Sequence, residues 1–431
     1  MEKTIRELAQ LIGGKVIGDD SVVITETRGF EQAAPQSITF AIGEYVEHIH
    51  LCKAGAIILE AEVTNAPMPQ IIVDNAKAAF AQVLQLFHPP VIVPREVHPT
   101  AIIGENVTLG NNVAIGAYCV INDNAVIGDN VTIRPYVYIG HNTRIGNDCD
   151  IYAGAIVHEN CVLGNRVVLR AKAVIGGEGF GFATENGVHT HIPQVGNVIL
   201  EDDVEIGDNC VIYPFVSILN GTRMGSGNSV YQCSVLGALP KDFNFVGERS
   251  FLIIGNDNTI RENGVINRAT HEGCKTVIGN HNFLMEGAHI SHDTQVGNDC
   301  VFGYGTKIAG DCEIGNGVIF STSVIENAKT RVGDRAMIQA GTTFSKDVPP
   351  YIILGGKPLA YGGVNTVMLK ADGVAPKTIK HIANAYRLVF HGQTSVFDSV
   401  LQVKEQVPDS PEIRNLVQFI EATEGGIVTK M

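Results

Sequence analysis

The sequence predicts a mainly β protein: a parallel β-helix of hexapeptide repeats lies between a small N-terminal α/β domain and a C-terminal α-helical domain. Three observations support this fold class. An aliphatic residue recurs at every sixth position between Pro99 and Gly176, and Gly, Asn or Asp occurs at most of the corners between hexads. The 431 residues include 47 glycines and no tryptophan, which is typical of short strands joined by tight turns. Both ends of the chain lack the six-residue period.

Residues 1–97 are predicted to form the small α/β domain. Thr4 is placed to cap an amphipathic helix that ends at Gly13-Gly14. Short apolar segments typical of strands follow, and a second helical segment ends before Pro89-Pro90. The alternation of apolar and polar residues is imperfect, so the pattern defines the elements but not a strand order.

Residues 98–355 are predicted to form the β-helix. Successive hexads such as AIIGEN, VTLGNN and VAIGAY carry an aliphatic residue third and a small or β-branched residue first. We expect both positions to point inward, with Gly, Asn and Asp supplying the left-handed backbone at each corner. Three hexads make one coil, and coils must stack because one coil cannot bury its own inner face. The period fails at 177–195 and 238–250, which we interpret as loops inserted into the scaffold.

Residues 356–431 are predicted to be an α-helical tail. Hexads stop at Pro349-Pro350, and three amphipathic segments follow. The last segment begins with Ser410-Pro411, which combines a capping residue with proline at the first helical position.

Composition and charge exclude several classes of function. The net charge of −14 argues against a nucleic-acid-binding protein, since affinity for phosphates requires clustered Lys and Arg. The N-terminal segment predicts neither a signal peptide nor a membrane span. The nine cysteines show no metal-ligand spacing and are expected to be reduced core residues of a cytoplasmic protein. His189 and His191 lack a third ligand, so no metal site is expected.

A polar cluster interrupts the repeats at Phe283–Asp293, FLMEGAHISHD. His289 and His292 are three residues apart, and Asp293 directly follows the second histidine. A carboxylate beside a histidine can orient the imidazole and stabilise its protonated form, as in a general base and its orienting partner. A histidine at a solenoid corner is otherwise a surface residue, and the pattern alone is compatible with both interpretations.

Longer motifs resemble two related families of acyltransferases of lipid A synthesis. Residues 1–237 resemble UDP-3-O-acylglucosamine N-acyltransferase, on the basis of SITFAIGEYVEHIHLCKAGAIIL and GGEGFGFATENGVHTHIPQVGNVILEDDVEIG. Residues 238–431 resemble UDP-N-acetylglucosamine 3-O-acyltransferase, on the basis of LPKDFNFVGE, AHISHD, KDVPPYIILGGKP and NAYRLVF. The resemblance implies that the β-helix is left-handed, that the protein is a homotrimer, and that no cofactor is bound.

The resemblance also implies roles for individual residues. His292 corresponds to the base that takes the proton of the sugar 3-hydroxyl, Asp293 orients it, and Gly310 supplies the backbone N–H that stabilises the oxyanion. His289 and Asp242 correspond to residues that contact the sugar nucleotide. The acyl chain, a (3-hydroxy)acyl group, would come from acyl carrier protein as co-substrate. The aromatic residues expected to hold the uracil ring in the N-terminal domain are Phe40 and Tyr45.

The interpretation favoured here is O-acylation of a UDP-glucosamine-type sugar nucleotide in lipid A synthesis, and two alternatives stay open. The opening domain favours N-acylation of UDP-3-O-acylglucosamine instead. Two departures from the family pattern, Asn244 in place of a lysine and Asp311 in place of a histidine, motivate the other alternative. This is a non-catalytic trimer that binds sugar nucleotides.

Overall fold

The computed structural model describes residues 1–89, 93–177, 182–192, 195–356, 358–391 and 395–428. Two compact units make up the chain, 1–93 and 94–431. The division of the second unit into 98–355 and 356–431 stays a prediction, and the tail helices share one continuous apolar core with the solenoid.

The N-terminal unit is the predicted α/β arrangement. Its five-stranded sheet has the order β2-β7-β6-β5-β4, and β1 pairs separately with β3. Thr4 begins the first helix with a complete capping box, and Gly13 ends it in the left-handed conformation. Apolar residues of α1 and α3 pack on one face of the sheet, where Ile5, Leu8 and Val83 are buried. The helices and strands are β1 (Lys3–Thr4), α1 (Ile5–Ile12), β2 (Lys15–Ile17), β3 (Val23–Ile24), β4 (Glu26–Thr27), β5 (Ser37–Phe40), α2 (Glu44–Glu47), β6 (Ala56–Leu59), β7 (Gln70–Ile72) and α3 (Ala76–Phe87), with 3-10 turns at Phe30–Gln32 and Ile49–Leu51.

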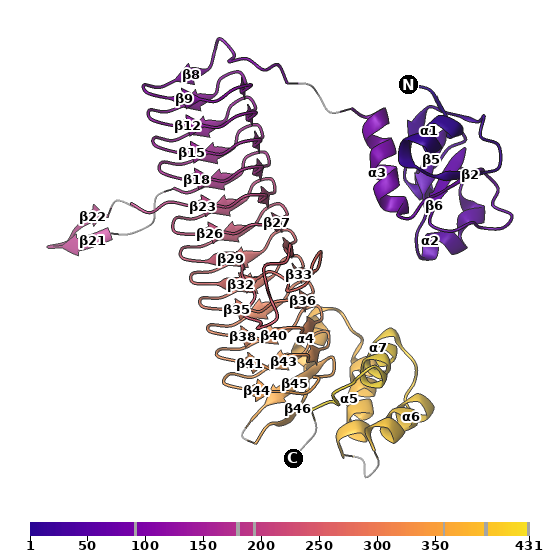
Figure 1. Ribbon diagram of the computed structural model, residues 1–431. Helices are drawn as coiled ribbons and strands as arrows, with labels where there is room; N and C mark the ends of the chain where they lie inside the picture. The colour runs from indigo at the N-terminus through magenta and orange to yellow at the C-terminus, as the bar shows by residue number, and fades with distance from the viewer. Residues whose placement is uncertain (90–92, 178–181, 193–194, 357, 392–394, 429–431) are drawn as a thin grey trace. The chain divides into compact units, whose positions relative to one another are not determined.

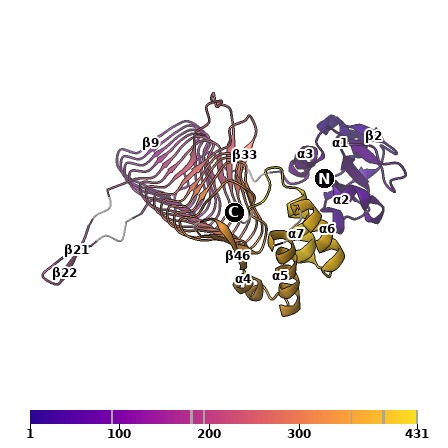
Figure 2. The ribbon, with the colours of Figure 1, turned by 90° about the horizontal axis from the view of Figure 1, so that it is seen from below.

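The second unit contains the predicted parallel β-helix, a stack of coils that superpose into one prism when viewed along the stack (Figures 1 and 2). Three long sheets, here named I, II and III, have 14, 12 and 11 strands. Strands pair in register with the next coil, as in Ala114 with Thr132 and Ile115 with Ile133. The turn that follows each strand of sheet II is here named corner II–III, and the other two corners, I–II and III–I, are named in the same way.

Most strands of the solenoid are two residues long. Sheet I consists of β8 (Ile102–Ile103), β11 (Val120–Ile121), β14 (Tyr138–Ile139), β17 (Ile156–Val157), β20 (Val174–Ile175), β25 (Val211–Ile212), β28 (Ser229–Val230), β31 (Thr259–Ile260), β34 (Phe283–Leu284), β37 (Val301–Phe302), β40 (Ile319–Phe320), β43 (Met337–Ile338), β45 (Ile352–Gly355) and the antiparallel β46 (Ala360–Val364). Sheet II consists of β9 (Thr108–Leu109), β12 (Val126–Ile127), β15 (Arg144–Ile145), β18 (Val162–Leu163), β23 (Ile199–Leu200), β26 (Ser217–Ile218), β29 (Val235–Ala238), β32 (Val265–Asn267), β35 (His289–Ile290), β38 (Lys307–Ile308), β41 (Ile325–Glu326) and β44 (Thr343–Phe344). Sheet III consists of β10 (Ala114–Ile115), β13 (Thr132–Ile133), β16 (Asp150–Ile151), β19 (Val168–Leu169), β24 (Glu205–Ile206), β27 (Thr222–Met224), β30 (Phe251–Ile254), β33 (Lys275–Ile278), β36 (Gln295–Val296), β39 (Glu313–Ile314) and β42 (Arg331–Val332).

The inward and outward positions of the hexads follow the predicted pattern. First and third positions are buried, as at Cys119 and Ile121. The corner residue that closes a hexad is left-handed, as at Asn106 and Asn130. The expectation that the fourth-position glycines supply left-handed backbone is wrong, because their φ angles are ordinary. A Cβ on Gly104 would lie 2.4 Å from the next coil, so glycine is required there by close approach.

The two insertions differ in structure. The first contains an antiparallel hairpin, β21 (Phe182–Glu185) and β22 (Val188–His191), joined by Asn186-Gly187. It projects from the solenoid in both views (Figures 1 and 2). The second is an irregular loop between β29 and β30. It exposes Phe243 and Val246 completely or nearly so.

The tail packs on the last coils as helices α4 (Thr366–Ala371), α5 (Pro376–His391), α6 (Val396–Gln406) and α7 (Pro411–Glu421). The predicted start of α7 is confirmed, since the Ser410 side chain accepts from the N–H of Ile413. Asn415 of α7 donates to Asp334 (3.0 Å) and to Tyr351 (2.7 Å) of the solenoid. Among the described residues, no helix is long and apolar enough to cross a membrane.

Candidate active site

The predicted base and its orienting residue meet at corner II–III, directly after β35. His292 Nδ1 lies 2.9 Å from Asp293 Oδ2, and the two side chains are 12% and 15% exposed. A carboxylate only accepts hydrogen bonds, so this contact assigns the ring hydrogen to Nδ1. Nε2 then keeps its lone pair and can take a proton from a substrate.

Asp293 is fixed by two threonines that the sequence reasoning missed. Thr270 donates to its carboxylate through the backbone N–H (3.2 Å to each oxygen) and through Oγ1 (2.7 Å). The Asp293 N–H donates to Thr276 Oγ1 at 2.8 Å. Both threonines flank the irregular stretch near His271–Lys275 in the preceding coil, a disturbance visible in the sequence. The carboxylate therefore keeps one orientation toward the imidazole.

Gly310 lies directly against the His292 ring, one coil further on. A Cβ built on Gly310 would be 2.5 Å from His292 Cε1 and 2.8 Å from Nε2, so only glycine leaves the ring in this position. The backbone of the two residues is also connected, because the Asp311 N–H donates to the His292 carbonyl at 3.0 Å. The third predicted catalytic residue is thus adjacent to the first.

The Gly310 N–H has no hydrogen-bond acceptor among the residues that the structure describes. At the same corner in earlier coils, this N–H is bonded by an Asn or Asp side chain of the next coil; we name this stack the asparagine ladder. Its bonds run from Asn111 N to Asp129 (2.6 Å), Asp129 N to Asn147, Asn147 N to Asn165, and Asn165 N to Asp202 (each 2.8 Å). The residue one coil after Gly310 is Ala328, whose side chain has no oxygen. The Gly310 N–H is therefore left for a ligand.

His289 lies on the outward side of β35, between Val265 and Lys307 in neighbouring strands. Burial lowers the pKa of His289 to about 4, and the charges of Lys241, Lys307 and His292 act in the same direction. The imidazole is therefore neutral near pH 7 and can donate one hydrogen bond and accept another. Lys241 and Lys307 were not singled out in the sequence.

Asp242 lies in the loop between β29 and β30. Its carboxylate accepts from the Asn244 N–H at 2.7 Å, and its carbonyl accepts from Phe245 N at 3.2 Å, so it organises a turn of its own loop. The charge of the neighbouring Lys241 acts on His289 and lowers the pKa of its imidazole. No hydrogen bond joins Asp242 to the two histidines within the described part of the chain.

Phe40 and Tyr45 are brought together in the N-terminal unit. They line one pocket of about 420 Å³ with Phe30, Ile42 and Lys77. Tyr45 is 47% exposed, and its ring centroid lies 5.0 Å from that of Phe30. Phe40 packs at 5.0 Å on Phe80, so one aromatic ring is anchored in the core and the other is accessible. A flat ligand can stack in such a pocket.

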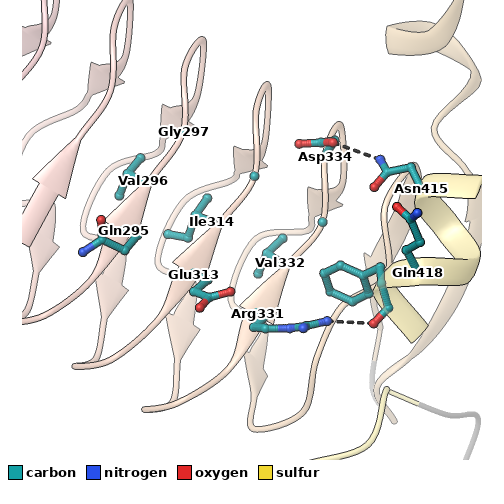
Figure 3. Close-up of a pocket in the computed structure, with 13 residues that line it drawn as sticks. Gln295, Val296, Gly297, Glu313, Ile314, Arg331, Val332, Asp334, Asn415 and Gln418 are labelled. Atoms are coloured by element: carbon teal, nitrogen blue, oxygen red, sulfur yellow. Dashed lines mark hydrogen bonds between the residues drawn. The ribbon is translucent and has the colours of Figure 1, made fainter. Parts of the chain in front are cut away.

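Another cavity, of about 540 Å³, lies between sheet III and helix α7 (Figure 3). Arg331 crosses it and donates to the Phe419 carbonyl at 2.7 Å, and Asn415 reaches Asp334 beside it. This groove is the seam between solenoid and tail. Within the described residues, no group of three or more His, Cys, Asp or Glu side chains is placed to hold a metal ion.

Curated relatives each match about half of the chain. An acyl-(acyl-carrier-protein)–UDP-N-acetylglucosamine O-acyltransferase of Xanthomonas campestris is 42% identical over 210 residues, which are 48% of this chain and 80% of the relative. The chain belongs to this family. The enzyme of the same name from Chlamydia abortus is 36% identical over 222 residues and 80% of its length.

Family models divide the acyltransferase as the resemblance predicts. The model of UDP N-acetylglucosamine O-acyltransferase, domain 2, matches residues 347–428, and that of UDP-3-O-(3-hydroxymyristoyl) glucosamine N-acyltransferase matches 21–86. The bacterial transferase hexapeptide model matches 275–310 and the GMPPB C-terminal domain model matches 87–179. The two-part resemblance and the prediction of an acyltransferase are confirmed.

A solved structure supports the fold. The Francisella novicida UDP-N-acetylglucosamine acyltransferase aligns with 78% of this chain and 94% of its own, with a TM-score of 0.53 and 22% identity. The predicted left-handed parallel β-helix is confirmed. The roles of the individual residues stay predictions.

Proposed function

We propose that the acyltransferase moves a (3-hydroxy)acyl chain from acyl carrier protein to the 3-hydroxyl of a UDP-glucosamine-type sugar nucleotide. The observation that supports this is the arrangement at corner II–III. There the His292 imidazole, bonded to Asp293 through Nδ1, lies over Gly310, whose N–H has no acceptor among the residues described. This is the set of groups that acyl transfer requires: a base, a group that orients it, and an oxyanion donor.

The reaction then follows from the positions of these groups. His292 Nε2 takes the proton of the sugar hydroxyl as its oxygen attacks the thioester carbonyl. The Gly310 N–H stabilises the negative charge that develops on the carbonyl oxygen, and Asp293 stabilises the imidazolium. When the intermediate collapses, the carbon–sulfur bond breaks, and the proton on His292 Nε2 passes to the leaving thiolate of acyl carrier protein.

Two regions are proposed to hold the sugar nucleotide. Neutral His289 can exchange hydrogen bonds with sugar hydroxyls, and Asp242 extends from the loop whose Lys241 lowers the pKa of His289. The pocket of Phe40 and Tyr45 has the stacking geometry that a uracil ring requires. We propose a homotrimer that acts in the cytoplasm, where acyl carrier protein and nucleotide sugars are available.

One observation favours a second candidate function. The match of residues 21–86 to the N-acyltransferase model, together with the aromatic pocket, supports N-acylation of UDP-3-O-acylglucosamine at the same catalytic corner. The amine would replace the hydroxyl as nucleophile, and His292 would take its proton. The non-catalytic trimer is the remaining alternative.

Acyl transfer assays on the full chain distinguish these candidates. UDP-N-acetylglucosamine and UDP-3-O-acylglucosamine are each offered with acyl carrier proteins of several chain lengths, and the product is analysed for ester or amide. His292→Ala is expected to lower kcat by about 10²- to 10⁴-fold. The matched control is His281→Ala, an exposed corner histidine whose Nδ1 is 4.0 Å from Asp257. Wild-type protein without turnover on either acceptor, or equal turnover in wild type and His292→Ala, would refute the enzymatic mechanism.

A further inference from the structure

Inside the solenoid, the same kind of hydrogen bond to a backbone carbonyl recurs at the corners. These carbonyls point inward, and a small polar side chain at the first position of a hexad donates to the corner carbonyl 15 residues later. Several cysteines of the inner column serve in this way. Examples are Cys119 to Arg134 O (3.0 Å), Cys149 to Gly164 O (3.2 Å), Cys300 to Gly315 O (3.1 Å), Cys312 to Asn327 O (3.3 Å), Thr143 to His158 O (2.9 Å) and Thr306 to Ser321 O (3.2 Å).

At the catalytic corner this donor is Thr294, which follows Asp293 in the sequence. Its hydroxyl, completely buried, donates to the Ala309 carbonyl at 3.1 Å. The peptide group between Ala309 and Gly310 is planar and trans, so a carbonyl held inward directs the Gly310 N–H outward. In earlier coils the N–H at this position also points outward, to an Asn or Asp side chain of the next coil.

The peptide groups before and after this one are also held by hydrogen bonds. The Ala309 N–H donates to the Glu326 carbonyl at 3.0 Å, and the Gly310 carbonyl accepts from the Lys329 N–H at 3.1 Å. Thr294 Oγ1 also lies 3.4 Å from the His292 carbonyl. One hydroxyl therefore lies between the backbone of the proposed base and that of the proposed oxyanion donor.

We propose that Thr294 is a positioning residue for acyl transfer: it fixes the Ala309–Gly310 peptide so that the Gly310 N–H meets the developing oxyanion. This inference rests on the proposed function. A donor to the carbonyl also polarises the peptide and strengthens its N–H as a donor. Removal of the hydroxyl leaves a buried carbonyl unpaired and allows the peptide to turn. The effect belongs to the transition state, so it should lower kcat more than it raises KM.

Thr306 offers a matched control. It occupies the same hexad position, is completely buried, and donates to Ser321 O at 3.2 Å, but at corner I–II rather than at the catalytic corner. If kcat falls because the solenoid is less stable, it should fall in both Thr294→Val and Thr306→Val. If kcat falls because the Gly310 N–H is misplaced, it should fall only in Thr294→Val.

The test compares kcat, KM and the melting temperature of Thr294→Val, Thr294→Ser and Thr306→Val. We expect kcat of Thr294→Val to fall about three- to tenfold, the equivalent of one hydrogen bond, with KM for the sugar nucleotide within about twofold. Thr294→Ser, which keeps the hydroxyl, should restore kcat. Thr306→Val should lower the melting temperature as much as Thr294→Val and leave kcat unchanged.

Two results would overturn the inference: equal kcat in Thr294→Val and Thr306→Val, or a kcat in Thr294→Ser as low as in the valine variant. If Thr294→Val does not fold, Thr294→Ala is the second variant without a hydroxyl. His292→Ala, measured in parallel, separates this result from the proposed function. Activity that is independent of His292 refutes the function itself, whereas dependence on His292 without dependence on the Thr294 hydroxyl refutes only the positioning role.

Discussion

Glu326 is a carboxyl group in the apolar column of the solenoid, and we predict that its replacement changes how stability depends on pH. It occupies the third position of the hexad VIENAK and pairs with Ile308 in one neighbouring coil and Phe344 in the other. The side chain is completely buried. One carboxyl oxygen accepts from Thr330 Oγ1 at 2.9 Å, and the other has no partner among the described residues. Burial raises the pKa of Glu326 to about 8 from its ordinary value of 4.5.

The sign follows from proton linkage. Between pH 4.5 and 8 the folded protein keeps the proton on Glu326 while the unfolded chain loses it, so the free energy of unfolding falls as pH rises. One pH unit corresponds to about 1.4 kcal/mol. At pH 7 the buried acid therefore costs about 3 kcal/mol relative to its contribution at pH 4.5, and above pH 8 no further loss is expected from this group.

The assay is urea unfolding of wild type, Glu326→Gln and Glu326→Leu at fixed protein concentration and several pH values from 5 to 8.5. Glutamine keeps the acceptor for Thr330 and cannot titrate, so the fall of the free energy of unfolding with rising pH that is due to Glu326 should disappear. Leucine, which matches the column, should be more stable than wild type at pH 8. Glu405→Gln, an exposed carboxylate of α6, is the control. Wild-type and Glu326→Gln midpoints that shift in parallel across the range would refute the reasoning.

Three further predictions concern the site and the folded units. Gly310→Ala should lower kcat by about 10²-fold in the acyl transfer assay, because the added Cβ would lie 2.5 Å from the His292 ring and displace the base. Tyr45→Ala should raise KM for the sugar nucleotide about tenfold in initial-rate kinetics, since it removes a stacking surface. Ser410→Ala should destabilise the tail by about 1 kcal/mol in chemical unfolding, because the N-cap of α7 is lost.

Each of these predictions has a control and a contradicting outcome. Gly425→Ala is the control for Gly310→Ala, because it adds a Cβ in open space. Equal kcat values in the two variants would contradict the placement of Gly310. Tyr304→Ala removes an exposed tyrosine of the solenoid, and an equal KM in the two tyrosine variants would contradict the uracil pocket. For Ser410, replacement by Asp keeps a capping side chain, and equal stability of the Ala and Asp variants would exclude the cap as the cause.

The sequence predicts the solenoid well because its period is local. Every hexad repeats the same choice of a small first residue and an aliphatic third residue, so many coils support one interpretation. The hairpin at 182–191 has a local signal too, since Asn186-Gly187 is a preferred two-residue turn, whereas the six-residue period shows this segment only as a departure.

The contacts that complete the site are not local, and this is why the sequence did not reveal them. Thr270 and Thr276 reach Asp293 from the preceding coil, across an irregular stretch whose length sets the register. A six-residue period also treats the three corners alike. It cannot say which residues share the corner of His292, and Gly310 was found through the family motif rather than through the repeat.

The asparagine ladder changes corner along the solenoid, and the proposed site lies where the ladder is absent from corner II–III. In the N-terminal coils the ladder occupies corner II–III, and from Asp208 to Asp334 an equivalent series of bonds occupies corner III–I instead. A solenoid whose corners all bond to themselves offers no backbone donor to a substrate. Moving the ladder keeps one corner stabilised. Corner II–III carries His292, Gly310 and Ala328 instead, and there the backbone N–H of the glycine has no acceptor in the described part of the chain. Restoring the ladder with Ala328→Asn should therefore place an amide oxygen on that N–H and lower kcat while preserving the fold. Ala328→Ser has a shorter side chain and should lower kcat less.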